Sequence, residues 1–108
     1  MLFKLSALRV TTRTATAVLI LGGLLASCAS TPVDPTAGWS PNKIYSEAKD
    51  EAASGAFEKS IGLYEKLEGR AAGTPLAQQA QLEKAFTQYR NGDKVQAIAT
   101  LDRFVRLH

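Results

Sequence analysis

The sequence has little of what catalysis, metal binding and disulfide bonding require. Its 108 residues include one histidine, His108, and one cysteine, Cys28. One histidine provides neither a metal cluster nor a His-based catalytic pair, and one cysteine forms no disulfide within the chain. The segment from Gly69 to Gly73 lacks the Lys-Ser/Thr that a phosphate-binding loop needs. We therefore expect a protein that is not an enzyme and has no cofactor, apart from the covalent lipid considered below.

Excess positive charge is also absent once the N-terminal segment is set aside. The whole chain has a formal net charge of +3. Lys4, Arg9 and Arg13 account for that excess, because the part from Cys28 onward contains ten Lys or Arg and ten Asp or Glu. Nucleic-acid binding needs a basic surface. We therefore expect no nucleic-acid partner.

No apolar run is long enough to span a membrane. The run over residues 15–26 has about a dozen residues, whereas a spanning helix needs about 20. It follows basic residues and ends in Leu25-Ala26-Ser27-Cys28, a lipobox. This order predicts a lipoprotein signal peptide over residues 1–27, a lipid on Cys28 and membrane attachment through acyl chains. Two alternatives are a Cys28 that follows the signal peptide unmodified and a small buried apolar residue.

Residues 28–40 have no periodic apolar pattern, and Pro32, Pro35 and Gly38 interrupt any helix there. We predict that these residues are the lipidated cysteine and a flexible Pro-rich tether. Trp39 either packs on the first helix or touches the membrane surface, and we favour packing.

Apolar residues recur with helical spacing from Pro41 to His108, and no alternating strand pattern appears. Ser40 before Pro41 and Thr74 before Pro75 are typical helix starts. Helices are expected from residue 41 to about 54, over 57–68 with Gly69 as the stop, over 75–90, and after Asp93 as the cap. The chain is therefore predicted to be all-α.

Apolar residues also form stripes along the last two helices. The third helix places Leu82, Ala85, Phe86 and Tyr89 on its expected buried side. The fourth places Val95, Ile98, Leu101 and Val105 on one face.

The four helices read as two copies of one helix pair. Gly55 and Gly92 are 37 residues apart, as are four further pairs of small or large apolar residues. A glycine turn, a small residue five positions later and a large apolar residue four after that form the core of the tetratricopeptide signature. The repeat-defining positions are Ala48, Gly55, Ser60, Tyr64, Ala85, Gly92, Ala97 and Leu101. The alternative is an unrelated four-helix bundle.

We therefore predict a tetratricopeptide-like α-solenoid in residues 41–108, with repeats over about 41–73 and 74–108. Solenoids generally need three or more repeats and a polar capping helix. Because the last helix is apolar, we expect the natural protein to continue beyond His108. The first helix of each pair lines a concave groove in such solenoids. The candidate groove residues are Lys49, Gln78, Gln81 and Gln88, and each has an alternative interpretation as an ordinary surface residue.

Four segments resemble one family of outer-membrane lipoproteins, the BamD or ComL family. They are Ser40-Pro41-Asn42-Lys43-Ile44-Tyr45, the turn over residues 55–61, the run over residues 78–82, and Ala97 to Leu107, which contains Leu101-Asp102-Arg103-Phe104. The resemblance covers about the first two of the family's five repeats. It implies a periplasm-facing subunit of the outer-membrane β-barrel assembly machinery. The implied partners are the barrel subunit, companion lipoproteins and unfolded outer-membrane protein segments.

The loop over residues 69–75 departs from the family pattern, because it lacks the usual aromatic-proline segment. Ala29, directly after the cysteine, is compatible with sorting to the outer membrane. Two alternatives use the same anchor. One is a tetratricopeptide pilotin that escorts a secretin or pilus component. The other is a lipid-anchored enzyme whose catalytic domain lies beyond His108.

Overall fold

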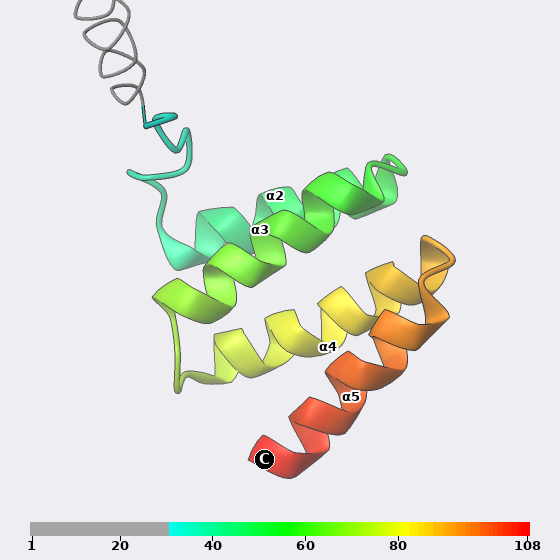
Figure 1. The fold of residues 1–108 in the computed structure, drawn as a ribbon. Helices are drawn as coiled ribbons and strands as arrows, with labels where there is room; N and C mark the ends of the chain where they lie inside the picture. The colour runs from blue at the N-terminus through cyan, green and yellow to red at the C-terminus, as the bar shows by residue number, and fades with distance from the viewer. Residues whose placement is uncertain (1–30) are drawn as a thin grey trace, which may run out of the picture. The chain divides into compact units, whose positions relative to one another are not determined.

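The computed structural model describes residues 31–108, which contain four α-helices and no strand. The helices are α2 (Pro41–Ala53), α3 (Phe57–Arg70), α4 (Pro75–Arg90) and α5 (Lys94–Leu107). Each packs mainly on the next along the chain, so they form two successive antiparallel pairs (Figure 1). The prediction of an all-α, tetratricopeptide-like fold is confirmed. The predicted signal peptide and Cys28 lie outside the described residues.

The predicted starts of α2 and α4 are confirmed. Ser40 Oγ accepts a hydrogen bond from the Lys43 N–H at 3.2 Å, and Thr74 Oγ1 accepts one from the Ala77 N–H at 3.3 Å. In each case proline follows the cap, where its missing N–H leaves no bond unmade. Two short polar side chains therefore fix where the first helix of each pair begins.

One predicted boundary is wrong in detail. Helix α3 runs through Gly69 to its last residue, Arg70, and the left-handed glycine that follows it is Gly73, with φ of 80°. Asp93 does occupy the N-cap position of α5, but its side chain accepts a hydrogen bond from the Asn91 amide at 2.8 Å and makes no capping bond to the helix. The tight turns of the two pairs do use glycine, since Gly55 and Gly92 have φ of 85° and 89°.

The core lies between the first pair and α4. Its buried members are Ile44, Ala48, Leu63, Tyr64, Leu67, Ala71, Ala77 and Ala80. Trp39 packs against this cluster, which agrees with the interpretation that favoured packing on the first helix. The ring of Trp39 also lies under the Lys43 ammonium, 4.8 Å from its centroid. Large side chains from α2 and α3 therefore pack against small side chains from α4.

The predicted tether over residues 28–40 is corrected in its second half. From Asp34 onward the chain is bound to α3, where the carboxylate of Asp34 contacts the side chains of Lys66 and Arg70. Thr36 is buried beneath these contacts. The proline and glycine content of this segment predicted a free linker. Composition does not show that an acidic side chain contacts two basic ones more than thirty residues later in the chain.

Candidate functional site

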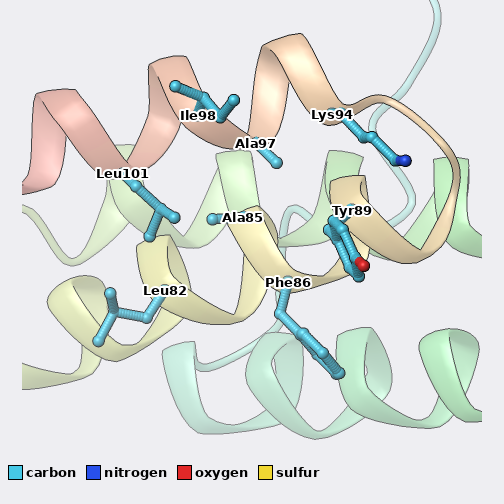
Figure 2. Close-up of a pocket in the computed structure, with 8 residues that line it drawn as sticks. All are labelled: Leu82, Ala85, Phe86, Tyr89, Lys94, Ala97, Ile98 and Leu101. Carbon is cyan, nitrogen blue, oxygen red and sulfur yellow. The ribbon is translucent and has the colours of Figure 1, made fainter.

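An apolar groove runs between α4 and α5 and has a volume of about 350 Å³. Figure 2 shows its lining, which is Leu82, Ala85, Phe86, Tyr89, Lys94, Ala97, Ile98 and Leu101. Ala85 and Ala97 form its floor, where the two helices approach closely, and both are buried. Ile98 remains 67% exposed on its wall. We call these eight residues the apolar groove.

The groove exists because α4 buries its small and polar face, not its large apolar one. The buried residues of α4 are Ala77, Ala80, Gln81, Lys84, Ala85, Thr87 and Gln88. Of the four residues predicted to be buried there, only Ala85 is, and Leu82, Phe86 and Tyr89 are exposed. Small side chains let α4 approach α3, while Lys84 and Gln88 have polar partners on α3 and α5. The predicted burial of the three large residues is therefore wrong.

Two polar pairs join the buried face of α4 to its neighbouring helices. The Lys84 ammonium, on a side chain only 4% exposed, lies 2.7 Å from a carboxylate oxygen of Glu68 on α3. Glu68 also faces Arg103 of α5 at 3.4 Å. Thr100 Oγ1 donates to the Gln88 Oε1 at 2.8 Å across the α4–α5 interface. These partners come from distant parts of the chain, and no sequence pattern pointed to them.

The repeat-defining residues occupy equivalent positions in the two pairs. Ala48, Ser60 and Tyr64 are buried in the first, and Ala85 and Ala97 in the second. Ser60 Oγ donates to the Ala48 carbonyl oxygen at 2.7 Å, which draws α2 and α3 together.

The exception is the last pair of equivalent positions. Tyr64 is fully buried, whereas its equivalent in the second helix pair, Leu101, is 44% exposed. Burial raises the pKa of the Tyr64 hydroxyl, and the charge of Glu83 on α4 adds to that rise. Helix α4 lies on the first pair at Tyr64, whereas the matching face of the second pair is the apolar groove.

The four candidate groove residues do not line one surface. Gln78 and Gln81 meet at a cavity of about 190 Å³ beside the start of α4. Lys49 lies at another, of about 200 Å³, formed by α2, α3 and α4, and its ammonium is 5.7 Å from the Tyr45 ring centroid. Gln81 and Gln88 are both buried, Gln88 against Thr100, so their assignment to an exposed groove is corrected. Helical spacing placed these residues on first helices but did not show which face was covered.

An arginine clamp beside the Lys49 cavity was missed by the sequence reasoning. The Arg90 guanidinium lies over Phe57 of α3 at 4.9 Å and over Phe86 at 5.9 Å. Arg90 thereby supports Phe86 where it stands on the edge of the apolar groove. The signal was present in the sequence as the helical spacing of Phe86 and Arg90, four residues apart.

In the part of the chain that the structure describes, exposed apolar side chains gather at the apolar groove. Within residues 31–108, no three His, Cys, Asp or Glu side chains are grouped as metal ligands would be. None of helices α2 to α5 is both long and apolar enough to cross a bilayer. A contiguous exposed apolar patch is typical of a surface that another protein element covers.

Comparison with known proteins agrees with the helical pattern. Residues 38–108 match the sequence profile of the YfiO family, described as outer membrane lipoprotein. A protein named outer membrane protein assembly factor BamD, from Neisseria meningitidis serogroup B, is 42% identical over 93 residues. Those of Neisseria gonorrhoeae and Vibrio cholerae are 38% identical over 93 residues and 33% over 90. The alignments cover 82% to 83% of this chain and 35% to 37% of each relative, so the chain spans about a third of their length.

Proposed function

This chain belongs to the YfiO family of outer membrane lipoproteins, and we propose that it acts in the assembly of outer-membrane proteins as a non-catalytic, lipid-anchored scaffold. The observation that carries the proposal is the family match over residues 38–108, supported by curated relatives that are named assembly factors. Because the chain spans about a third of those relatives, their whole activity is transferred here only as part of this proposal.

Depletion tests this role. The natural gene that encodes this chain is placed under a repressible promoter, and the amounts of β-barrel proteins in the outer membrane are followed after repression. We expect those proteins to decline while an inner-membrane protein stays constant. Unchanged β-barrel levels after complete depletion would overturn the assembly role.

Anchoring through Cys28 is the second part of the proposal. The lipobox Leu25-Ala26-Ser27-Cys28 supports acylation of the thiol, and Ala29 supports sorting to the outer membrane, with the repeats facing the periplasm. In cells grown with labelled palmitate, the protein should carry the label and sediment with outer membranes. The C28S variant should lose both. A labelled C28S variant would contradict this assignment.

The third part concerns how the scaffold binds. We assign to the apolar groove the docking of an amphipathic α-helix, because the equivalent face of the first pair already holds one. There, α4 packs across α3 at Tyr64 and contributes alanines such as Ala77 and Ala80. The groove in Figure 2 presents similar chemistry, with an alanine floor and aliphatic and aromatic walls. Implied partners are other β-barrel assembly subunits and incoming outer-membrane protein segments.

Site-specific cross-linking identifies the occupant. A photoreactive amino acid is placed at Ile98, in the groove, and at Asp50 on α2 as the control. A cross-link from Ile98 to a second protein supports partner docking. A cross-link within the same polypeptide would show that the protein fills the groove itself, and the partner assignment would fall while the assembly role stands on the depletion result.

A further inference from the structure

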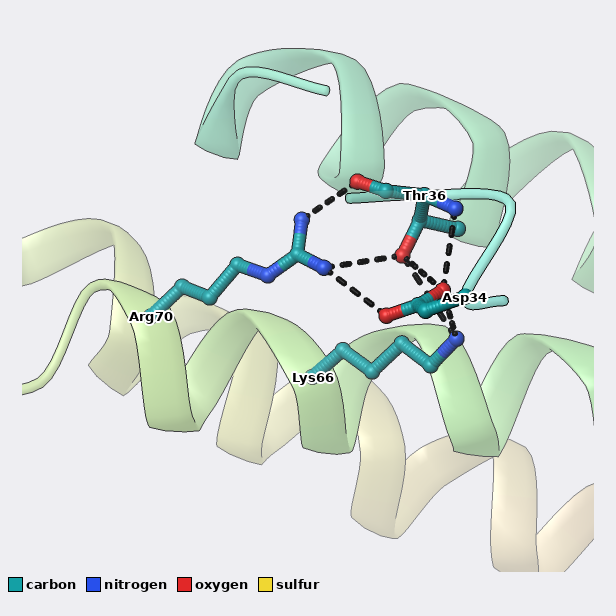
Figure 3. A network of polar contacts seen from close by, with 4 residues as sticks. All are labelled: Asp34, Thr36, Lys66 and Arg70. Atoms are coloured by element: carbon teal, nitrogen blue, oxygen red, sulfur yellow. Dashed lines mark hydrogen bonds and ion pairs between the residues drawn. The ribbon is translucent and has the colours of Figure 1, made fainter. Parts of the chain in front are cut away.

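The segment before the first helix is held on α3 by a compact polar network. The Asp34 carboxylate lies 2.8 Å from the Lys66 ammonium and 2.9 Å from the Arg70 guanidinium, one oxygen to each (Figure 3). Thr36 joins its backbone N–H and hydroxyl to Asp34 at 2.9 Å and 2.8 Å. We call Asp34, Thr36, Lys66 and Arg70 the Asp34 clamp.

Hydrogen bonds to a buried residue hold the Asp34 clamp in addition to its ion pairs. Arg70 donates to the carbonyl and hydroxyl oxygens of Thr36, whose exposed fraction is only 3%. The chain then turns, with the Trp39 N–H donating to the Thr36 carbonyl at 3.0 Å, and the Trp39 ring packs on the core. Residues 34–39 are therefore bound at both ends. Exposed ion pairs alone contribute little, so the hold on this segment depends on the ion pairs together with buried Thr36 and the packed Trp39 ring.

The Asp34 clamp shortens the linker that joins Cys28 to the helical repeats. An extended chain spans at most about 3.5 Å per residue. From Cys28 to Asp34 is a step of six residues, which reaches roughly 20 Å. From Cys28 to Ser40 is a step of twelve, which reaches roughly 40 Å. Binding residues 34–39 to α3 therefore halves the length of linker between the lipid attachment point and the repeats.

We propose that the Asp34 clamp sets the distance between the membrane and the helical repeats, keeping the Arg70 end of α3 within about 20 Å of the anchor when closed and doubling that reach when open. This inference rests on the lipid anchor of the proposed function. It adds that the linker has two lengths. An assembly scaffold with such a linker holds its docking surface close to the bilayer until the clamp is released.

Fluorescence in vesicles tests the proposal. The lipidated protein, with a donor dye on a cysteine introduced by Ala72→Cys in the exposed loop after α3, is reconstituted into phosphatidylethanolamine–phosphatidylglycerol vesicles that carry headgroup acceptors. We expect Asp34→Asn to lower the energy transfer clearly. Asp50→Asn changes an exposed carboxylate on α2 that belongs to no ion pair found in residues 31–108, and should leave it unchanged.

A second readout does not depend on the membrane. Chymotrypsin cleaves after Trp39 only when residues 34–40 leave α3. Asp34→Asn and Lys66→Gln should each speed that cleavage severalfold, with helical circular dichroism unchanged. Equal cleavage rates and equal energy transfer in Asp34→Asn and the unaltered protein would overturn the proposal. A protein that fails to float with the vesicles would instead overturn the lipid anchor, and the cleavage rates would still decide whether the clamp opens.

Discussion

Ser60 sets how closely the first two helices approach. It is fully buried, and its hydroxyl donates to the Ala48 carbonyl oxygen of α2 at 2.7 Å. A leucine there would have to push α2 and α3 apart, since overpacked cores relax only by shifting the backbone. We expect S60L to lower the free energy of unfolding by about 2 kcal/mol, measured by urea denaturation.

An exposed serine provides the matched control for S60L. Ser46 lies on the outer surface of α2, and S46L should change the free energy of unfolding by less than about 0.5 kcal/mol. If both substitutions cost the same, the close approach at Ser60 would not be what limits side-chain size.

The ion pair between Lys84 and Glu68 predicts an asymmetry between its two partners. Removing Glu68 leaves a buried ammonium, 4% exposed, without its counter-charge. Such uncompensated charges cost about 3 kcal/mol. We expect E68A to lower the free energy of unfolding by roughly that amount, whereas K84M, which replaces the ammonium by an apolar chain, should cost less than about 1 kcal/mol. Equal losses in chemical denaturation would contradict this account.

Helix caps and tight turns were predicted correctly from the sequence, because they depend on residues close together in the chain. Ser40 and Thr74 bind N–H groups three residues away, and Gly55 and Gly92 supply turns within the same hairpins. Lys84 was not foreseen as a buried residue, because its partner Glu68 is on another helix. Sequence patterns therefore predict caps and turns well, but they predict contacts between helices poorly.

Helix α4 shows at the scale of one element why periodicity was not enough. Its large residues, Leu82, Phe86 and Tyr89, recur at helical spacing and were assigned to the core. In the structure it is a middle helix with neighbours on both sides, and its alanine and glutamine face meets α3. The fold class followed from the helical period, but the exposed groove depended on which face of α4 packs against its neighbours.

The segment before α2 has an acid dependence of its own. Hydrogen bonding from Lys66, followed by the N–H and hydroxyl of Thr36, holds the pKa of Asp34 well below its ordinary value of about 3.9. Arg70 faces the same carboxylate. A lowered folded-state pKa adds stability that is fully present above about pH 4 and is lost as the pH falls through the folded-state value.

Trp39, the only tryptophan, reports on this segment. We expect its fluorescence to keep its native wavelength down to about pH 4 and to shift only below that, as Asp34 becomes protonated. In D34N the shift should already be present at pH 7. A midpoint above about pH 4 in the unaltered protein would show that Asp34 is not held ionised by the clamp.

At the scale of the whole molecule, two surfaces follow from one repeated unit. In the first pair, α4 covers the apolar face, and Asp34 holds the segment before α2 against α3. The second pair offers the same kind of face as the apolar groove. This arrangement supports the proposed scaffold, in which one end is held at the membrane and the other binds a partner helix.

The groove also predicts how the folded protein binds an apolar probe. An anilinonaphthalene dye should bind the native chain, and I98E should weaken that binding at least fivefold, because a carboxylate would stand on the groove wall. V95E is the matched control: Val95 is on the same helix and 80% exposed, yet it lies outside the groove. Both residues are exposed, so both variants should unfold within about 0.5 kcal/mol of the parent. Equal loss of dye binding in I98E and V95E would mean that the dye reads the general apolar surface of α5 and not this groove.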